Sequence, residues 1–136
     1  MKHGAGILLI KDGKVLLVRA GNKSKQLNGA ISFPGGTIEQ GESPETTAKR
    51  ELTEETGLVA GKLIDFPGNY VEAELQLKLE QAQVSFKVFL INEFLGELKA
   101  TDETEPFWVD LDEAQKMILL GKNNQILESA IKFLKI

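Results

Sequence analysis

The sequence predicts an α+β domain, because apolar segments with strand-like patterns fill its first and middle parts while helical patterns occupy one central and one final segment. The 136 residues fit the usual size of one domain, and we expect a single domain over residues 1–136. With 42% hydrophobic and 26% charged residues, the composition is that of a globular protein and excludes a disordered or collagen-like chain.

The first predicted element is a β-hairpin. Two apolar, partly β-branched runs cover residues 5–10 and 14–19, and Asp12-Gly13 between them suits a two-residue turn. A third short strand is expected over residues 31–33, ended by a Pro-Gly-Gly sequence.

A central helix should begin after Ser43 and end at Gly57. Serine is a good N-cap, Pro44 suits the first helical position, and glycine accepts the left-handed conformation that ends many helices.

The second half of the chain predicts more strands and a helical end. Strand patterns cover residues 63–71, 75–79, 84–91 and 107–109, a polar loop covers 95–106, and helical patterns cover 111–120 and 124–135. The pair Asn123-Asn124 is expected to precede the last helix, where an asparagine would act as its N-cap.

Residue types limit the possible chemistry. The chain has no cysteine and one histidine, His3, so thiol nucleophiles and cysteine-bound metals are excluded and carboxylates are the expected catalytic groups. No apolar stretch is long enough for a signal peptide or a membrane span. We therefore expect a cytoplasmic protein without membrane contact.

The negative charge is concentrated in one segment. Residues 39–55 contain six Glu, one Lys and one Arg, a net charge of −4 that equals that of the whole chain. A broad basic surface for a nucleic acid polymer is not indicated. The cluster instead predicts binding of a cation.

Three of these glutamates, Glu51, Glu54 and Glu55, should be neighbours on the central helix at i,i+3 and i,i+4 spacing. Mg²⁺ or Mn²⁺, which prefers oxygen ligands, would offset their mutual repulsion. The alternative is a solvated acidic helix stabilised by surface pairs such as Glu45–Lys49 and Arg50–Glu54.

The wider spacing favours the cation site. The sequence from Gly36 to Leu58 resembles the Nudix box, G-x5-E-x7-R-E-U-x-E-E-x-G-U with U aliphatic, and all specified positions match: Gly36, Glu42, Arg50, Glu51, Leu52, Glu54, Glu55, Gly57 and Leu58. The resemblance implies an α/β/α sandwich around a mixed sheet and hydrolysis of a nucleoside diphosphate linked to another group. It also implies that Glu51, Glu54 and Glu55 hold Mg²⁺ or Mn²⁺.

The resemblance assigns supporting roles as well. It implies that Glu42 lies outside the direct ligands or on a bridging water, and that Arg50 orients a box carboxylate, most readily that of Glu51. Gly35 and Gly36 would let the backbone approach substrate closely.

A general base is expected either among the box glutamates or in a later loop. The loop candidates are Glu97, Glu103 and Glu105, of which we favour Glu103 because it precedes the strand of Trp108. For Trp108 and Phe66, core packing is favoured over stacking on a base.

Two further residues are candidates for substrate contact. Arg19 ends the second strand, where some relatives place a phosphate-binding arginine, and a solvated strand-end arginine is the alternative. Asn124 lies in the region where the MutT branch reads a purine base.

The branch is assigned by exclusion. No Pro occurs near Ala73, where ADP-ribose hydrolases commonly have one, and the Tyr typical of dinucleoside polyphosphate hydrolases is missing because Tyr70 comes too early. A MutT-like enzyme is therefore expected to cleave a nucleoside triphosphate to monophosphate and pyrophosphate. ADP-ribose, dinucleoside polyphosphates and nucleotide sugars remain alternatives, and so does a nucleotide-sensing module. The expected partner is a small nucleotide, bound by a monomer or homodimer.

Overall fold

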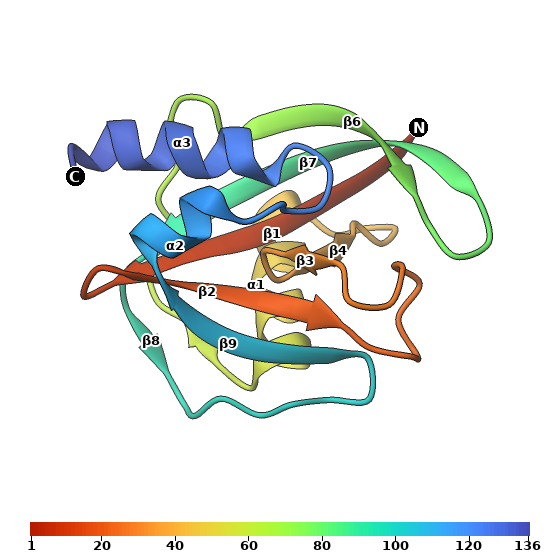
Figure 1. Cartoon of the computed structure of the whole chain (residues 1–136), viewed down its shortest axis with the longest axis horizontal. Helices are drawn as coiled ribbons and strands as arrows, with labels where there is room; N and C mark the ends of the chain where they lie inside the picture. The colour runs from red at the N-terminus through yellow and green to blue at the C-terminus, as the bar shows by residue number, and fades with distance from the viewer.

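A mixed β-sheet forms the middle layer of the protein, and helices lie on both of its faces (Figure 1). The structure is a computed structural model that describes residues 1–136. The strand order is β3-β2-β1-β7-β6, with β4 paired to β1 and β9 paired to β2. The central pair β1–β7 is parallel, and the other pairs are antiparallel. The sheet strands are β1 Lys2–Lys11, β2 Lys14–Ala20, β3 Ile31–Ser32, β4 Gly35–Thr37, β6 Tyr70–Gln76, β7 Gln81–Ile91 and β9 Thr104–Asp110.

The helices lie on opposite faces of the sheet. Helix α1, Pro44–Thr56, is behind the sheet in Figure 1, whereas α2, Leu111–Lys116, and α3, Asn123–Leu134, lie in front. Alternate residues of β1 separate the two cores, because Leu8 packs toward α3 and Ile7 toward α1. The α/β/α sandwich and the α+β class are confirmed.

The predictions for the first hairpin turn and for both ends of α1 are confirmed. The hairpin turn has positive φ at both Asp12 and Gly13, 54° and 75°, as a type I′ turn requires. Helix α1 begins after Ser43, whose side chain accepts a hydrogen bond from the Thr46 backbone, and ends at left-handed Gly57.

Several boundaries differ from the expectation. The segment 63–71 makes only an isolated bridge, Ile64↔Leu90, because Pro67-Gly68 interrupts it before β6 begins at Tyr70. Strand β4 was not predicted, and neither was the small sheet formed by β5, Val59–Ala60, and β8, Phe94–Leu95. Strands of two or three residues are too short to show a periodic pattern in the sequence. Strand β9 begins at Thr104, inside the expected polar loop, and α2 is shorter than expected.

The start of α3 is also a correction. The helix begins at Asn123, and Lys122 is its N-cap without a side-chain cap bond. Both asparagines are therefore inside the helix, where their amides bond other segments. None of the helices combines the length and the apolar character that a membrane span requires.

Candidate active site on the first helix

Helix α1 lies against the sheet through Ala48 and Leu52, which are fully buried. This packing fixes the rotation of the helix, so that its glutamates follow one edge beside β4 and β9. The box residues expected to act together are thus carried by one rigid element.

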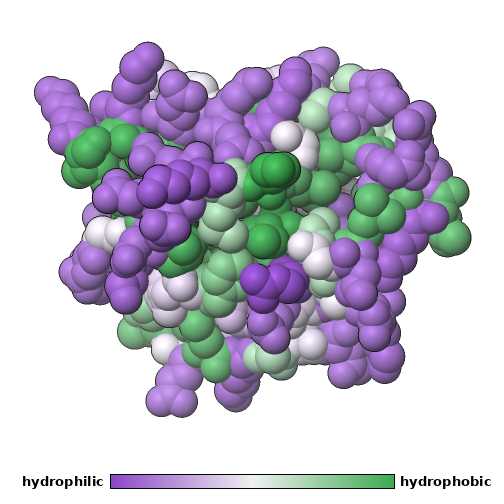
Figure 2. All heavy atoms as spheres, viewed as in Figure 1, coloured by the Kyte–Doolittle hydropathy of each residue, from purple (hydrophilic) through white to green (hydrophobic).

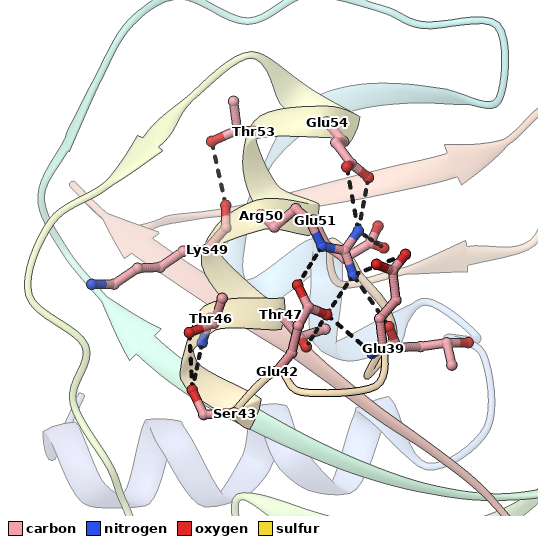
Figure 3. Close-up of polar contacts among 11 residues, drawn as sticks. Glu39, Glu42, Ser43, Thr46, Thr47, Lys49, Arg50, Glu51, Thr53 and Glu54 are labelled. Carbon is pink, nitrogen blue, oxygen red and sulfur yellow. Dashed lines mark hydrogen bonds and ion pairs between the residues drawn. The ribbon is translucent and has the colours of Figure 1, made fainter.

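Arg50 is the centre of an ion-pair cluster (Figure 3). Its guanidinium donates to Glu42 at 2.8 and 3.0 Å, to Glu51 at 3.0 Å and to Glu54 at 3.1 and 3.3 Å. Glu39 lies 3.8 Å from the same group and was not expected from the sequence. Arg50 therefore contacts Glu51, as the orienting interpretation predicts, and also Glu54, as the surface-pair interpretation predicts.

Glu42 is fixed as an anion before the helix. Besides Arg50, it accepts hydrogen bonds from the Glu39 backbone N–H at 3.0 Å and the Thr47 hydroxyl at 2.8 Å. The bonds from Arg50 first, and then those from Glu39 and Thr47, lower the pKa of Glu42 to about 2. The carboxylate thus holds Arg50 in place at the beginning of the cluster.

Glu55 and Glu51 have a different electrostatic environment. Burial raises the pKa of Glu55 to about 8, against the effect of the Gly35 N–H, which donates to its Oε1 at 2.6 Å. Burial also raises the pKa of Glu51, an effect opposed by Arg50 and reinforced by Glu54. At both positions the protein alone stabilises an ionised carboxylate poorly.

Glu103 is brought to this cluster from a distant part of the sequence. Its backbone carbonyl accepts from Gly21 at 2.8 Å, and the adjacent Thr104 hydroxyl donates to the Glu55 carbonyl at 3.1 Å. The negative charge of Glu103 raises the pKa of both Glu51 and Glu55. Of the loop candidates, Glu103 thus lies within electrostatic reach of the box, while Glu105 forms an ion pair with Arg19.

The carboxylates of Glu51, Glu54 and Glu55 fit a hard divalent cation in their chemistry, although they do not yet converge on one point. All donors are carboxylate oxygens, and two of them are held in partly buried positions where a cation would offset their repulsion. No group of three or more His, Asp or Glu side chains is arranged to hold a metal ion. Glu54, with 56% of its side chain exposed and its carboxylate on Arg50, has room to turn toward such an ion.

A cavity of about 160 Å³ opens on the α3 face of the sheet and extends to the glycines beside the carboxylates. Gly35 and Gly36 line it, and each also contacts a box carboxylate: Gly35 donates to Glu55, and a Cβ on Gly36 would overlap the carboxylate of Glu51. The two glycines therefore connect the cavity with the acidic edge of α1.

The structure separates the two asparagines. Asn123 lines the cavity, accepts from the Phe33 N–H at 3.1 Å and donates to the Leu120 carbonyl at 2.8 Å. Asn124 accepts from the Leu119 N–H at 3.0 Å and donates to the Met117 carbonyl at 2.8 Å, and it does not line the cavity. Asn124, the residue expected to contact a base, thus stabilises the α2–α3 loop, whereas Asn123 lies at the cavity.

The remaining candidates lie outside the cavity. The guanidinium of Arg19 bonds Glu105 at 3.0 Å and lies 4.7 Å from the ring centre of Phe107. Phe66 is 4% exposed in the α3-side core, and Trp108 packs against the α1-side core, so core packing is confirmed for both.

Comparison with known proteins identifies the family of the chain. Residues 2–130 match the NUDIX domain family. The chain is 34% identical to an 8-oxo-dGTP diphosphatase of Haemophilus influenzae over 78% of this chain and 73% of that protein. It is 33% identical to an ADP-ribose pyrophosphatase of Methanocaldococcus jannaschii over 81% of this chain and 62% of that protein.

A solved structure shows the same fold. The MutT protein from Methanosarcina mazei Go1 superposes with a TM-score of 0.76 at 25% identity, over 99% of this chain and 96% of that one. Nudix hydrolases generally depend on divalent metal, which agrees with the all-oxygen donor set. With the box residues on α1, the matching fold and the matching relatives, the protein belongs to the Nudix hydrolase family.

Proposed function

We propose that this protein hydrolyses a nucleoside triphosphate to the monophosphate and pyrophosphate, as one Nudix domain over residues 1–136. The observation that carries the proposal is the connection, through Gly35 and Gly36, between an apolar cavity and the carboxylates of α1. Such a cavity suits a base and sugar, while the acidic edge suits a cation-bound polyphosphate. The relative named 8-oxo-dGTP diphosphatase supports this substrate class.

Glu51, Glu54 and Glu55 would hold Mg²⁺ or Mn²⁺, with Glu42 outside the direct ligands. A bound cation would neutralise the polyphosphate and lower the pKa of a water molecule that attacks it. Arg50 keeps Glu42 and Glu51 in place, and this pre-organises the carboxylates for the ion.

The hydrolysis requires one proton acceptor. The oxygen of a water molecule bonds to one phosphorus of the α–β anhydride, the bond between that phosphorus and the bridging oxygen breaks, and the other side of the anhydride leaves with the bridging oxygen and the electron pair, so that monophosphate and pyrophosphate are released. Glu103 or a box glutamate accepts the proton from the water. The loop residue is supported for this role because its charge acts on Glu51 and Glu55 and because the adjacent Thr104 bonds the Glu55 carbonyl.

Substrate contacts follow from the lining of the cavity. For contact with the base we propose Asn123 rather than Asn124, because only Asn123 is among the residues that line the cavity. Gly35 and Gly36 would allow the polyphosphate to approach the backbone, and Arg19 would contact a phosphate only after leaving Glu105. We propose a small-nucleotide enzyme of the cytoplasm, monomeric or homodimeric, without nucleic acid polymer or membrane as partner.

A substrate screen tests the assignment. Nucleoside triphosphates, ADP-ribose, dinucleoside polyphosphates and nucleotide sugars are compared by kcat/KM, with phosphate and pyrophosphate release measured separately. The proposal predicts the highest kcat/KM for a triphosphate and release of pyrophosphate. Faster cleavage of ADP-ribose, the substrate named for the Methanocaldococcus jannaschii relative, would contradict the substrate class and leave the family unchanged.

A further inference from the structure

The loop that connects β2 with β3, residues 21–29, contains no buried residue. Its one large apolar side chain, Leu27, is 46% exposed. The loop lies at the right-hand side of Figure 1, and Figure 2, in the same view, shows that hydrophilic residues surround the hydrophobic centre of this face. Because apolar packing does not hold the loop, its position depends on the hydrogen bonds that it makes.

On one side, this β2–β3 loop is bonded to the turn between β6 and β7, residues 77–80. The Lys78 ammonium donates to the carbonyl of Asn22 at 2.7 Å and to the carbonyl of Gly21 at 3.4 Å. The backbone N–H of Lys78 donates to the Lys25 carbonyl at 3.1 Å, and an isolated β-bridge also joins the two segments. A charged donor shared by two successive carbonyls restrains both of their peptide groups.

On its other side, the β2–β3 loop is bonded to the Glu103 loop, residues 96–103 between β8 and β9. The Gly21 N–H donates to the Glu103 carbonyl at 2.8 Å, one step beyond the last β2–β9 pair, Ala20↔Thr104. A Cβ on Gly21 would lie 3.4 Å from the same carbonyl oxygen, so the two backbones are in close contact. The contacts of Gly21 therefore connect Lys78 with Glu103.

We propose that Lys78 is a positioning residue for Glu103, because its bonds to the Gly21 and Asn22 carbonyls keep the Gly21 N–H on the Glu103 carbonyl. The proposal rests on the proposed function, in which Glu103 accepts the proton of the attacking water. A general base must lie within hydrogen-bond reach of that water, so a displaced Glu103 loop slows the reaction. Lys78 itself does not line the cavity, and its contribution therefore belongs to kcat rather than to binding.

Amide hydrogen exchange tests the contact without turnover. Lys78→Met removes the charged donor from an exposed turn and should retain the fold, with a melting temperature near that of the wild type. The Gly21 amide should exchange about tenfold faster in this variant, whereas Lys78→Arg, which keeps a charged donor, should preserve slow exchange. The matched control is Lys132→Met, which removes an exposed lysine on α3 and should leave the exchange of Gly21 unchanged.

Steady-state kinetics with a nucleoside triphosphate and Mg²⁺ test the consequence for the reaction. Lys78→Met should lower kcat about tenfold and leave KM near the wild-type value, while Lys78→Arg and Lys132→Met keep the wild-type kcat. In a Glu103→Gln background, Lys78→Met should lower kcat no further, because Lys78 acts through Glu103. An equal loss of kcat in both backgrounds would overturn the positioning role, and so would an equal loss in Lys132→Met.

The two proposals fail separately, because the exchange measurement does not depend on the reaction. If Glu103→Gln lowers kcat but Lys78→Met changes neither kcat nor the exchange of Gly21, the positioning role is wrong and the proposed function stands. If Glu103→Gln is fully active but Gly21 exchanges faster in Lys78→Met, the link from Lys78 to the Glu103 loop is supported and only the assignment of Glu103 as the base is contradicted.

Discussion

At the scale of single residues, the glutamates of the box divide into two groups. Glu42 is stabilised as an anion by Arg50 and two further donors, whereas Glu51 and Glu55 are partly buried and repel each other. In the proposed enzyme this division would let the first group fix the geometry while the second group binds the ion.

Glu55→Gln should stabilise the metal-free protein. The pKa of Glu55 is about 8 in the folded protein and near 4.5 in the unfolded chain. Between these values the folded state binds more protons, so stability falls as the pH rises from about 4.5 to about 8. The variant should show a flatter dependence of Tm on pH and a higher Tm at pH 8.

The control for this experiment is Glu128→Gln, which removes an exposed carboxylate on α3. It should keep the pH dependence of the wild type. Measurements in chelator by differential scanning calorimetry between pH 5 and pH 9 decide the outcome. An identical slope for Glu55→Gln and the wild type would show that Glu55 is not the group responsible.

Glu54→Gln separates the catalytic role from a surface ion pair. Its carboxylate is 56% exposed and bonded to Arg50, so the fold should be retained with little change in Tm. If Glu54 holds the cation, kcat should fall by at least about 100-fold. Steady-state rates and circular dichroism measure both effects, and full activity would leave Glu54 as a surface residue only.

At the scale of secondary-structure elements, α1 and the α2–α3 loop are positioned in different ways. The limits of α1 were predictable, because Ser43, Pro44 and Gly57 are local signals that tertiary packing did not override. The start of α3 was not, because Asn123 and Asn124 bond segments outside the first helical turn instead of capping it. No local pattern shows that the side chain of Asn123 will accept a hydrogen bond from Phe33, which is ninety residues away in the sequence.

Asn124→Ala should weaken the loop without changing base preference. The variant loses the bonds to Met117 and Leu119 and should be less stable by about 1–2 kcal/mol. The kcat/KM values for different nucleotides should change by the same factor, because Asn124 does not line the cavity. Denaturant unfolding and a comparison of kcat/KM for purine and pyrimidine triphosphates test this prediction. A change in base preference at unchanged stability would contradict it and would indicate that Asn124 contacts the base.

At the scale of the whole molecule, the carboxylate edge and the cavity differ in how far the sequence predicted them. Glu51, Glu54 and Glu55 lie within one helix, so their spacing alone predicted that they are neighbours. The position of the Glu103 loop near the box could be predicted only by resemblance, since it depends on the bond from Gly21 to the Glu103 carbonyl and on the bond from the adjacent Thr104 to Glu55. The cavity was not predicted, because its lining is assembled from β1, β4, β6, β7 and the α2–α3 loop.

The central claim is that a divalent cation on the α1 carboxylates is required for pyrophosphohydrolysis. The most direct measurement is pyrophosphate release from a nucleoside triphosphate in EDTA, followed by addition of excess Mg²⁺ or Mn²⁺, for the wild type and Glu54→Gln. The wild type should be inactive in EDTA and recover fully with metal, and the variant should stay at least about 100-fold slower. Undiminished pyrophosphate release by the wild type in EDTA would contradict the claim.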